Sequence, residues 1–456
     1  MTSVTFTNES FARKLQSQTL GLWLPRDKKT ILQWVGQKVE QLATQNLPMN
    51  PNVQAFSDYV EGNNTLRSLA QLMFTEVPPD YHNGTDPVGA PQIRDFATFI
   101  QVLNTIIVTG PEFFEVDDPD AMGLIGFPIN AVLDWPMGTK SGWAFWYLPE
   151  VNQKFQPILH DFETFLASSA SKVVLKAPNG WLGPKGQAMI VAKANLDGLT
   201  RTFTQIFDCP DPSDPIYLGF ESWDQFFTRT FMPDLRPVVQ PMNTSILNNS
   251  CESGPLQYKK NVKATDFFLL KGQPYSLNNM LNSNESYVKQ FANGSVYQAF
   301  VSALSYHRWN SPVNGKVVDV FNVPGTYYSE SPFQGFPNPD ANGPNNSQPY
   351  ISSVATRGII YIQAEGPIGL MAIVYVGMAE VSSCQFTVTK GQTISKGDQL
   401  GMFHFGGSTH CMVFRPGVKL VFNQPPGEPQ DDGTWDWSAK KNLPVNGALA
   451  LVTDEP

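Results

Sequence analysis

The chain has 456 residues, enough for two or three domains around a large buried core. Its 31 basic and 40 acidic residues give a formal net charge of −9, which leaves no excess of positive charge to bind nucleic acid or an anionic membrane surface. Charged residues make up only 16% of the chain, and its 37 prolines and 35 glycines predict many loops.

The first residues are polar and mixed in charge, without the continuous apolar run of a signal peptide. No window reaches the length of a membrane span. We therefore expect a cytoplasmic protein with no integral membrane segment. The cysteines lie far apart, which predicts neither a disulfide framework nor a zinc site; they are Cys209, Cys251, Cys384 and Cys411.

Apolar residues recur at helical spacing in several segments of the first half, and each segment is expected to turn one apolar stripe toward a core. These segments are 27–43, 52–60, 65–74, 96–108 and 151–166. The three prolines of Asp208–Pro215 fit neither a helix nor a central strand and mark a boundary. We predict a helical N-terminal domain over residues 1–215, with no catalytic cluster in it.

Beyond this boundary, runs of β-branched and aromatic residues have the length of strands. They are 315–323, 358–363, 369–376, 384–388, 411–414 and 419–422. Ser311–Val318 and Val388–Leu400 resemble the two halves of a barrel-sandwich hybrid, the fold of lipoyl and biotinyl carriers. The predicted fold class is α+β, with a mainly β domain of this type over residues 216–456. A carrier role is a minor alternative, because no lysine lies at a hairpin tip between equivalent strands.

The tetrapeptide Gly406-Gly407-Ser408-Thr409 has a hydroxyl directly after two residues without Cβ. Since glycine allows backbone angles closed to other residues, Ser408 can fold back onto the carbonyl of Gly407. Attack there would convert the amide into an ester, and elimination followed by hydrolysis of the enamine would leave a pyruvoyl group at a new N-terminus. Taken alone, the tetrapeptide is more simply a turn of small residues between two strands.

Five pieces of the C-terminal half together resemble the phosphatidylserine decarboxylase family in their order and separations. They are Phe220–Arg229 with Arg236-Pro237, Tyr306–Trp309 with Ser311-Pro312, Val323–Gly325, Lys396–Asp398 with Leu400-Gly401, and Gly406–Thr409. The resemblance runs from Phe220 to Phe414. The long helical N-terminal region, which includes Gly180-Trp181-Leu182, looks like the extension of the soluble fungal branch that includes L-tryptophan decarboxylases.

Members of this family are pyruvoyl enzymes made by self-cleavage before the serine, so the resemblance implies a covalent pyruvoyl cofactor derived from Ser408. A ketone that condenses with the substrate amine takes up the electrons left on Cα when carbon dioxide departs. The carbanion must then be protonated. His307, in Tyr306–Trp309, is the candidate acid, because the ordinary pKa of histidine suits proton transfer near neutrality.

The sequence departs from the family at two positions. Asn310 stands where the family has a second histidine, and Glu252 where it has an aspartate; with the serine, these resemble a protease triad that drives maturation. Asparagine cannot accept the serine proton. His404 and His410 flank Ser408, and in extended strands both would share its face, so either is a candidate base. Strain and water, or a chain that stays uncut and inactive, are the alternatives.

The favoured function is decarboxylation of a free aromatic L-amino acid to its amine, with L-tryptophan as the leading candidate substrate. The main alternative is phosphatidylserine decarboxylation, and a second is an uncut, non-catalytic binding protein of the same fold. A serine hydrolase is disfavoured, because the glycine two residues after the nucleophile is missing. The expected partner is a small-molecule amino acid and not nucleic acid, and the sequence leaves the oligomeric state open.

Overall fold

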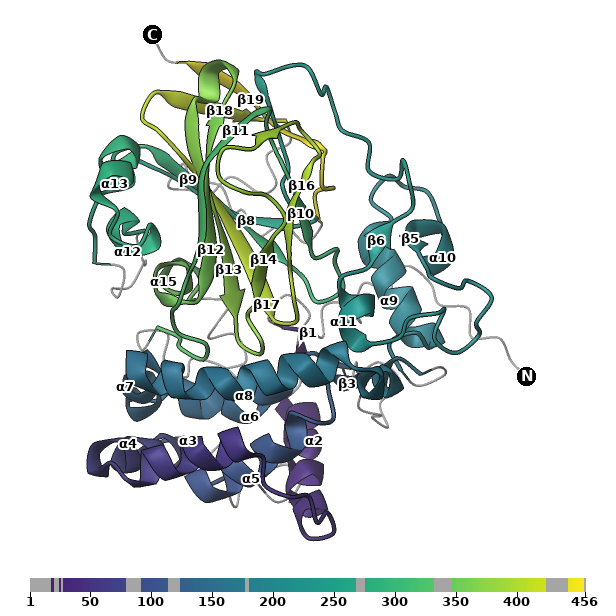
Figure 1. Cartoon of the computed structure of the whole chain (residues 1–456), viewed down its shortest axis with the longest axis vertical. Helices are drawn as coiled ribbons and strands as arrows, with labels where there is room; N and C mark the ends of the chain where they lie inside the picture. The colour runs from purple at the N-terminus through teal and green to yellow at the C-terminus, as the bar shows by residue number, and fades with distance from the viewer. Residues whose placement is uncertain are drawn as a thin grey trace. The chain divides into compact units, whose positions relative to one another are not determined.

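The computed structural model describes residues 18–19, 24–25, 28–78, 92–113, 124–176, 180–267, 275–331, 347–423 and 442–454. Helices and several antiparallel sheets make it an α+β protein, as predicted (Figure 1). The chain folds into two compact units that interleave along the sequence. The helical unit is Met1–Met189 with Glu221–Trp223 and Tyr328–Ser347, and the sheet unit is Ile190–Phe220, Asp224–Tyr327 and Gln348–Pro456. The division into domains at residue 215 stays a prediction.

The five helices predicted from apolar spacing are confirmed in the helical unit: α2 (Lys28–Leu42), α3 (Pro51–Glu61), α4 (Asn64–Thr75), α5 (Phe96–Ile106) and α8 (Pro149–Ala167). Asn50, Asn63 and Asp95 begin α3, α4 and α5 by accepting hydrogen bonds from backbone N–H groups of the first turn. Edge-to-face aromatic pairs join α3, α7 and α8, with the Phe56 ring 6.4 Å from Phe145 and 5.1 Å from Phe155.

Other elements of the first half were not expected from the sequence. They are β1 (Gln18–Thr19), β2 (Leu24–Pro25), β3 (Glu112–Phe113), β4 (Leu124–Ile125), α6 (Pro128–Gly138), α7 (Lys140–Tyr147), the 3-10 helix η4 (Ser169–Leu175) and α9 (Pro184–Ala194). Every residue of α6 and much of α7 are buried, so neither helix shows the one-sided apolar stripe by which a surface helix is recognised.

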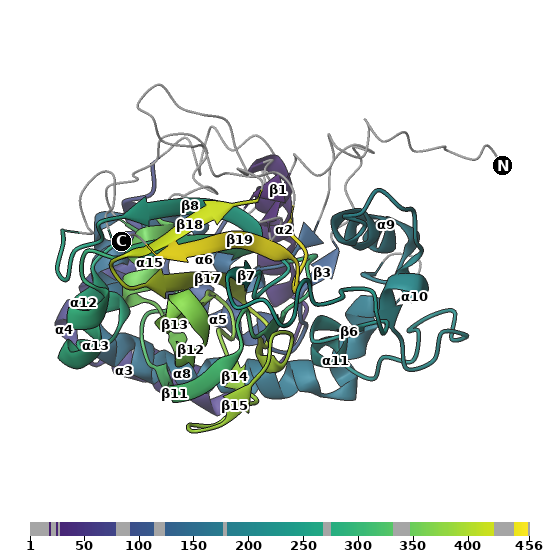
Figure 2. The ribbon, with the colours of Figure 1, turned by 90° about the horizontal axis from the view of Figure 1, so that it is seen from above.

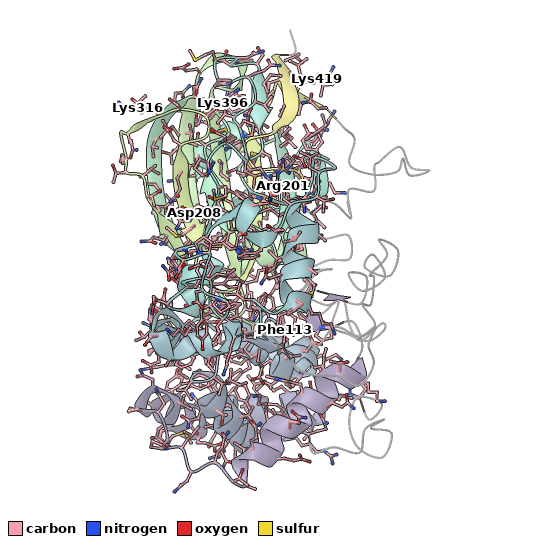
Figure 3. All side chains as sticks on the ribbon, turned by 90° about the vertical axis from the view of Figure 1, so that its right-hand side faces the viewer. Phe113, Arg201, Asp208, Lys316, Lys396 and Lys419 are labelled. Atoms are coloured by element: carbon pink, nitrogen blue, oxygen red, sulfur yellow. The ribbon has the colours of Figure 1, made fainter. Side chains whose placement is uncertain are left out.

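The sheet unit is built on an antiparallel sheet with the strand order β15-β11-β12-β13-β17-β9-β8. Its strands are β8 (Gly254–Lys260), β9 (Ser295–Val301), β11 (Gly315–Val323), β12 (Arg357–Ala364), β13 (Leu370–Met378), β15 (Thr393–Ile394) and β17 (Gly407–Phe414). Every residue of β13 is buried, whereas Lys316 on β11, next to the edge strand β15, is exposed (Figure 3). The central strands β13 and β17 therefore carry the core of this unit.

Two smaller sheets complete the unit. One has the order β10-β16-β14, from Arg308–Asn310, Gln399–Phe403 and Cys384–Phe386. The other has the order β18-β19-β7, from Val418–Phe422, Ala448–Asp454 and Ile246–Asn248, and Figure 2 shows β18 and β19 side by side. Shorter elements are β5 (Phe207–Asp208), β6 (Thr230–Phe231), α10 (Phe203–Ile206), α11 (Trp223–Phe227), α12 (Leu277–Met280), α13 (Glu285–Phe291), α15 (Gln348–Val354) and η6 (Gly366–Ile368).

The six strands predicted from the sequence are confirmed as β11, β12, β13, β14, β17 and β18, although β17 begins four residues earlier than expected, at Gly407 rather than Cys411. In the described part of the chain no sheet closes into a barrel, and the barrel-sandwich-hybrid type stays a prediction. Among the described helices, none combines the length and the apolar character needed to cross a bilayer.

Candidate functional site

Ser408 lies near the start of an interior strand, not in a turn. β17 pairs with β13 on one side and β9 on the other, which places Ser408 opposite Gly377 and Val301. The residue is fully buried, and its hydroxyl has no hydrogen-bond partner within the described residues. A buried hydroxyl without a partner costs free energy, so its presence here indicates a reactive group or a place for an ordered water.

The chain reaches Ser408 through a turn that requires glycine. β16 ends at Phe403 in the three-stranded sheet, and β17 begins at Gly407 in the seven-stranded sheet. Gly406 adopts a φ of +152°, and a Cβ there would lie 2.9 Å from the backbone nitrogen of Ser382. Both the backbone angle and the space exclude a larger residue. The first glycine of the tetrapeptide is thus required by the fold.

His410 shares a strand face with Ser408. It comes two residues later in β17, about 7 Å further along an extended strand, and lies opposite Tyr375 of β13. Its ring is buried, centred 6.2 Å from the Tyr297 ring and 6.4 Å from the Tyr375 ring, and neither nitrogen has a hydrogen-bond partner among the described residues. Burial lowers the pKa of His410 to about 3, so the imidazole is neutral and able to accept a proton.

His404 is placed differently from the sequence expectation. It follows the last residue of β16 and lies in the turn rather than in an extended strand with Ser408, so the premise of a shared face fails for it. Its Nδ1 is 2.8 Å from Asp224 Oδ1 and its Nε2 is 2.9 Å from Gln385 Oε1. These contacts tie the turn to α11 and β14 and occupy both ring nitrogens.

His307 immediately precedes β10 and is fully buried. Its ring stacks on Phe227 with centroids 3.8 Å apart and an interplanar angle of 15°, while its carbonyl accepts a hydrogen bond from Phe403 N at 3.0 Å. Burial, and then the positive charge of Arg229, lower the pKa of His307 well below its ordinary value. The sequence argument assumed the ordinary pKa, so an acid role requires that bound substrate raise it.

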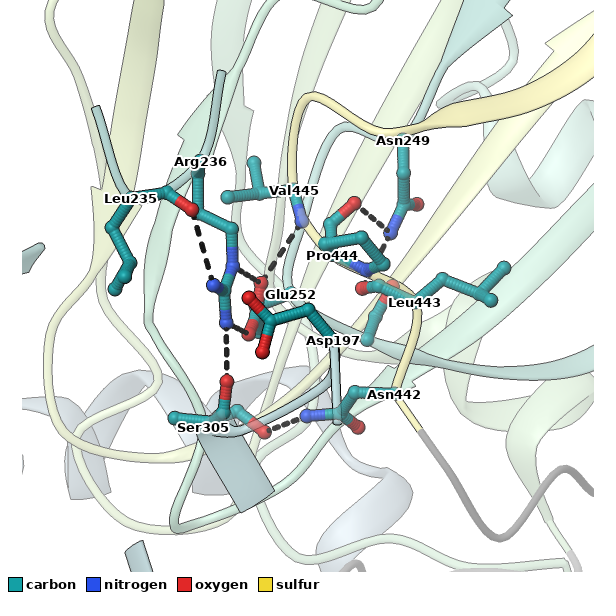
Figure 4. A network of polar contacts seen from close by, with 12 residues as sticks. Asp197, Leu235, Arg236, Asn249, Glu252, Ser305, Asn442, Leu443, Pro444 and Val445 are labelled. Carbon is teal, nitrogen blue, oxygen red and sulfur yellow. Dashed lines mark hydrogen bonds and ion pairs between the residues drawn. The ribbon is translucent and has the colours of Figure 1, made fainter. Parts of the chain in front are cut away.

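Glu252 is held in a buried ion pair (Figure 4). Arg236 donates to it from Nε at 3.0 Å and from Nη2 at 2.5 Å, and the Val445 N–H donates at 2.9 Å. Burial raises the pKa of Glu252, against the opposing effect of Arg236. Since these donors engage both carboxylate oxygens, the structure shows Glu252 in a structural contact and not hydrogen-bonded to Ser408.

Asn310 belongs to the same network. Its side-chain amide donates to Asn446 Oδ1 at 3.0 Å, and Asn446 in turn donates to the Arg236 carbonyl at 3.0 Å. On the other side, the Ser250 hydroxyl donates to the Asn310 carbonyl at 2.8 Å and lies 2.8 Å from the Tyr375 hydroxyl. Glu252 and Asn310, the two residues that differ from the family pattern, are thereby linked by hydrogen bonds to Tyr375, which lies in the strand opposite His410.

The structure adds groups that sequence reasoning missed: Tyr297, Tyr375 and the segment Ala379–Ser382 that follows β13. Both tyrosines lie within strands and are fully buried, so in sequence they are indistinguishable from core aromatic residues. Ala379, Glu380 and Ser382 have positive φ angles although none of them is glycine, and the residue types in this segment do not predict that conformation.

Comparison with known proteins finds similar sequences over most of the chain. Two family models, both described as phosphatidylserine decarboxylase, match residues 50–190 and 223–430. The "Decarboxylase iboD" of Amanita muscaria is 37% identical over 364 residues, which cover 77% of this chain and 99% of that protein. The L-tryptophan decarboxylase of Psilocybe cubensis is 37% identical over 341 residues, covering 71% of this chain and 73% of the relative.

A more distant relative is the phosphatidylserine decarboxylase proenzyme 3 of Schizosaccharomyces pombe, 32% identical over 201 residues, 44% of this chain and 19% of that protein. The two family models, together with the match that covers 99% of the Amanita muscaria decarboxylase, support one assignment. The chain is a carboxy-lyase that belongs to the phosphatidylserine decarboxylase family, on the branch that contains the fungal L-tryptophan decarboxylases.

Proposed function

We propose that the chain cuts itself between Gly407 and Ser408 and then decarboxylates a free aromatic L-amino acid, first of all L-tryptophan, with a pyruvoyl group made from Ser408. The observation that carries the proposal is the buried hydroxyl of Ser408, which has no hydrogen-bond partner among the described residues and directly follows the Gly406 turn. A hydroxyl in that position fits the precursor of such a group, because it is shielded from bulk water and close to the carbonyl that it must attack.

The cleavage balances with water as the only co-reactant. The Ser408 oxygen bonds to the Gly407 carbonyl carbon, the bond from that carbon to the Ser408 nitrogen breaks, and the hydroxyl proton ends on the freed amine. Loss of the Ser408 Cα proton then expels Gly407 as a carboxylate and leaves a dehydroalanine. Addition of water and release of ammonia convert that residue to the pyruvoyl group, without any oxidant or reductant.

His410 is the group that accepts the Ser408 proton in this proposal. It lies on the same strand face, is neutral because burial lowers its pKa to about 3, and has both ring nitrogens without a partner in the described part of the chain. The neutral imidazole can accept the hydroxyl proton and pass it onward to the leaving nitrogen. His404, the other flanking histidine, has both nitrogens engaged by Asp224 and Gln385.

The pyruvoyl ketone supplies the sink for the electrons that remain on the substrate Cα when carbon dioxide leaves. His307 then delivers a proton to that carbon. Its ring is fixed by stacking on Phe227 and is buried from solvent, which orients its nitrogens and excludes competing water. The negative carboxylate of a bound amino acid raises a neighbouring imidazole pKa, so substrate itself would bring His307 toward the range in which it donates.

The choice of a free aromatic amino acid is supported by the relatives, two of which are named L-tryptophan decarboxylase. Phosphatidylserine is the second candidate substrate, because both family models carry that description. An uncut, non-catalytic chain is the third possibility, since Asn310 removes the family's second histidine.

Intact mass under denaturing conditions tests self-cleavage. The expected result is two chains, 1–407 and 408–456, with the smaller one lighter by one ammonia than its serine-started sequence and resistant to Edman degradation. The Ser408→Ala variant should remain one chain. An active preparation with a single full-length mass would refute the pyruvoyl group.

Carbon dioxide release tests the substrate. L-Tryptophan, and more weakly tyrosine and phenylalanine, should be decarboxylated without added pyridoxal phosphate, and borohydride should attach the substrate amine to the smaller chain. Turnover of phosphatidylserine vesicles together with no turnover of free amino acids would select the second candidate instead.

A further inference from the structure

The four residues that follow β13 have an unusual backbone. Ala379, Glu380 and Ser382 have φ angles of 53°, 38° and 53°, in the left-handed region that side chains with a Cβ rarely adopt. Together with Val381 they are buried, each with 5% or less of its surface exposed. We call these residues the 379–382 loop. Such a conformation persists only where the surrounding structure enforces it, and it tends to occur at functional sites.

Hydrogen bonds hold the loop against the turn that leads to Ser408. The Ser382 N–H donates to the Phe405 carbonyl at 3.2 Å, and directly after the loop the Ser383 carbonyl accepts a hydrogen bond from the His404 N–H at 3.0 Å. Inside the loop, the Ser382 hydroxyl donates to the Ala379 carbonyl. Ser382 therefore joins the bent loop to the residue that comes directly before Gly406.

Ser382 also lies close to two glycines near Ser408, one before it in the chain and one opposite it on the neighbouring strand. A Cβ on Gly406 would lie 2.9 Å from the Ser382 nitrogen, and a Cβ on Gly377 would lie 2.5 Å from the Ser382 carbonyl oxygen. Gly377 is the cross-strand partner of Ser408. The loop is thus in close backbone contact with the strand residue opposite Ser408 and with the turn that precedes it.

We infer that the 379–382 loop, with Ser382 as its positioning residue, holds the Phe405–Ser408 segment in the conformation from which the Ser408 hydroxyl attacks the Gly407 carbonyl. This inference rests on the proposed self-cleavage. Two adjacent glycines would otherwise let the segment sample many backbone conformations, few of which bring the oxygen to the carbonyl. Contact with the fixed 379–382 loop on one side excludes most of these backbone conformations before the reaction begins.

The test follows cleavage in the full chain produced by in vitro translation, sampled over time by mass. Ser382→Gly removes the hydroxyl bond and relaxes the backbone, and should slow the appearance of the 408–456 piece by tenfold or more. Ser283→Gly is the matched control, because Ser283 is an exposed serine with nearly the same φ, 55° against 53°, in the turn between α12 and α13. It should cut at the wild-type rate.

Hydroxylamine identifies the step affected, since it cleaves an ester but not an amide. If Ser382 positions the attack, Ser382→Gly forms little ester, and hydroxylamine should not restore release of the small chain. Release restored to the wild-type rate would overturn the inference, because the ester would then form normally. Thermal unfolding of the uncut Ser408→Ala background, with and without Ser382→Gly, checks that the fold is kept.

Ala379→Gly gives a second variant that relaxes the loop but leaves every Ser382 atom in place, and it decides the question should Ser382→Gly not fold. It too should slow cleavage, by a smaller factor. If the folded loop variants cut as fast as wild type, the loop has no positioning role and self-cleavage itself stands. If the wild-type chain is never cut, the proposed function fails and the inference with it.

Discussion

At the scale of single residues, burial sets apart His307, His404 and His410, which have the same ordinary pKa. His410 and His307 are fully buried, and desolvation lowers the pKa of both. His404 is partly exposed and bonded to a carboxylate and an amide. Of the two histidines that flank Ser408, only His410 combines its strand face with unengaged ring nitrogens among the described residues.

Substitution of the flanking histidines should therefore give unequal results. His410→Phe keeps a ring of similar size in the core but removes the acceptor, and should slow self-cleavage by on the order of 10²-fold or more, the usual worth of a placed base. His404→Gln should be cut at nearly the normal rate. The measurement is the fraction of full-length chain against time. Normal maturation of His410→Phe would contradict the assignment and leave water as the proton acceptor.

His307 should separate maturation from turnover. His307→Ala should still be cut in two, because its ring does not belong to the strand face of Ser408, yet amine production should fall by on the order of 10²-fold or more. Borohydride should still attach substrate to the small chain of this variant. An equal loss of cleavage would show that His307 serves the precursor rather than the mature enzyme.

At the scale of elements, β17 is an interior strand that cleavage would turn into the first strand of a separate chain. Residues 408–414 pair with β13 and β9 on either side, and the later strand β19 pairs with β18 and with β7. If the small chain dissociated, both the backbone hydrogen bonds of β17 and the burial of its side chains would be lost. After the proposed cleavage, the piece would be held by the sheet and not by a covalent bond.

The two chains should therefore migrate as one particle under native conditions. Size-exclusion chromatography of cut protein should give the same elution volume as the uncut Ser408→Ala variant, and the two masses should separate only after denaturation. Elution of a free small chain without denaturant would mean that the pairing of β17 does not survive the cut.

At the scale of the whole molecule, one buried acid of the helical unit and one buried base of the sheet unit respond to pH in opposite directions. In the helical unit, burial raises the pKa of Asp134 from 3.8 to about 7, so its contribution to stability is full below pH 3.8 and is lost as pH rises through 7. In the sheet unit, burial lowers the pKa of His410 from 6.5 to about 3, so its contribution is full above pH 6.5 and is lost as pH falls toward 3.

Lowering the pH from 7.5 to 5 should therefore stabilise the helical unit and destabilise the sheet unit, each by about 2 kcal/mol from these groups. Amide hydrogen exchange read by mass spectrometry, corrected for the intrinsic effect of pH, should slow in α5–α8 and speed up in β13 and β17. Asp134→Asn should abolish only the first change, and His410→Phe should reduce only the second. Parallel changes in both units would contradict the opposite signs.

The sequence by itself determined many of the longer local elements and the kind of chemistry. Apolar periodicity found α2, α3, α4, α5 and α8, and β-branched runs found β11–β14, because these patterns depend on near neighbours. The five motifs between Phe220 and Phe414 led to the family, since each motif consists of short stretches that lie close together in the chain.

The tertiary structure alone decided which side chains meet. Long-range pairing placed Ser408 inside the sheet opposite Gly377, set His410 against Tyr375, and turned His404 away into the bend between two sheets. Burial then moved the pKa values of His307 and His410 far from the ordinary value on which the sequence argument relied. Desolvation and cross-strand contacts depend on residues distant in sequence, so no local pattern encodes them.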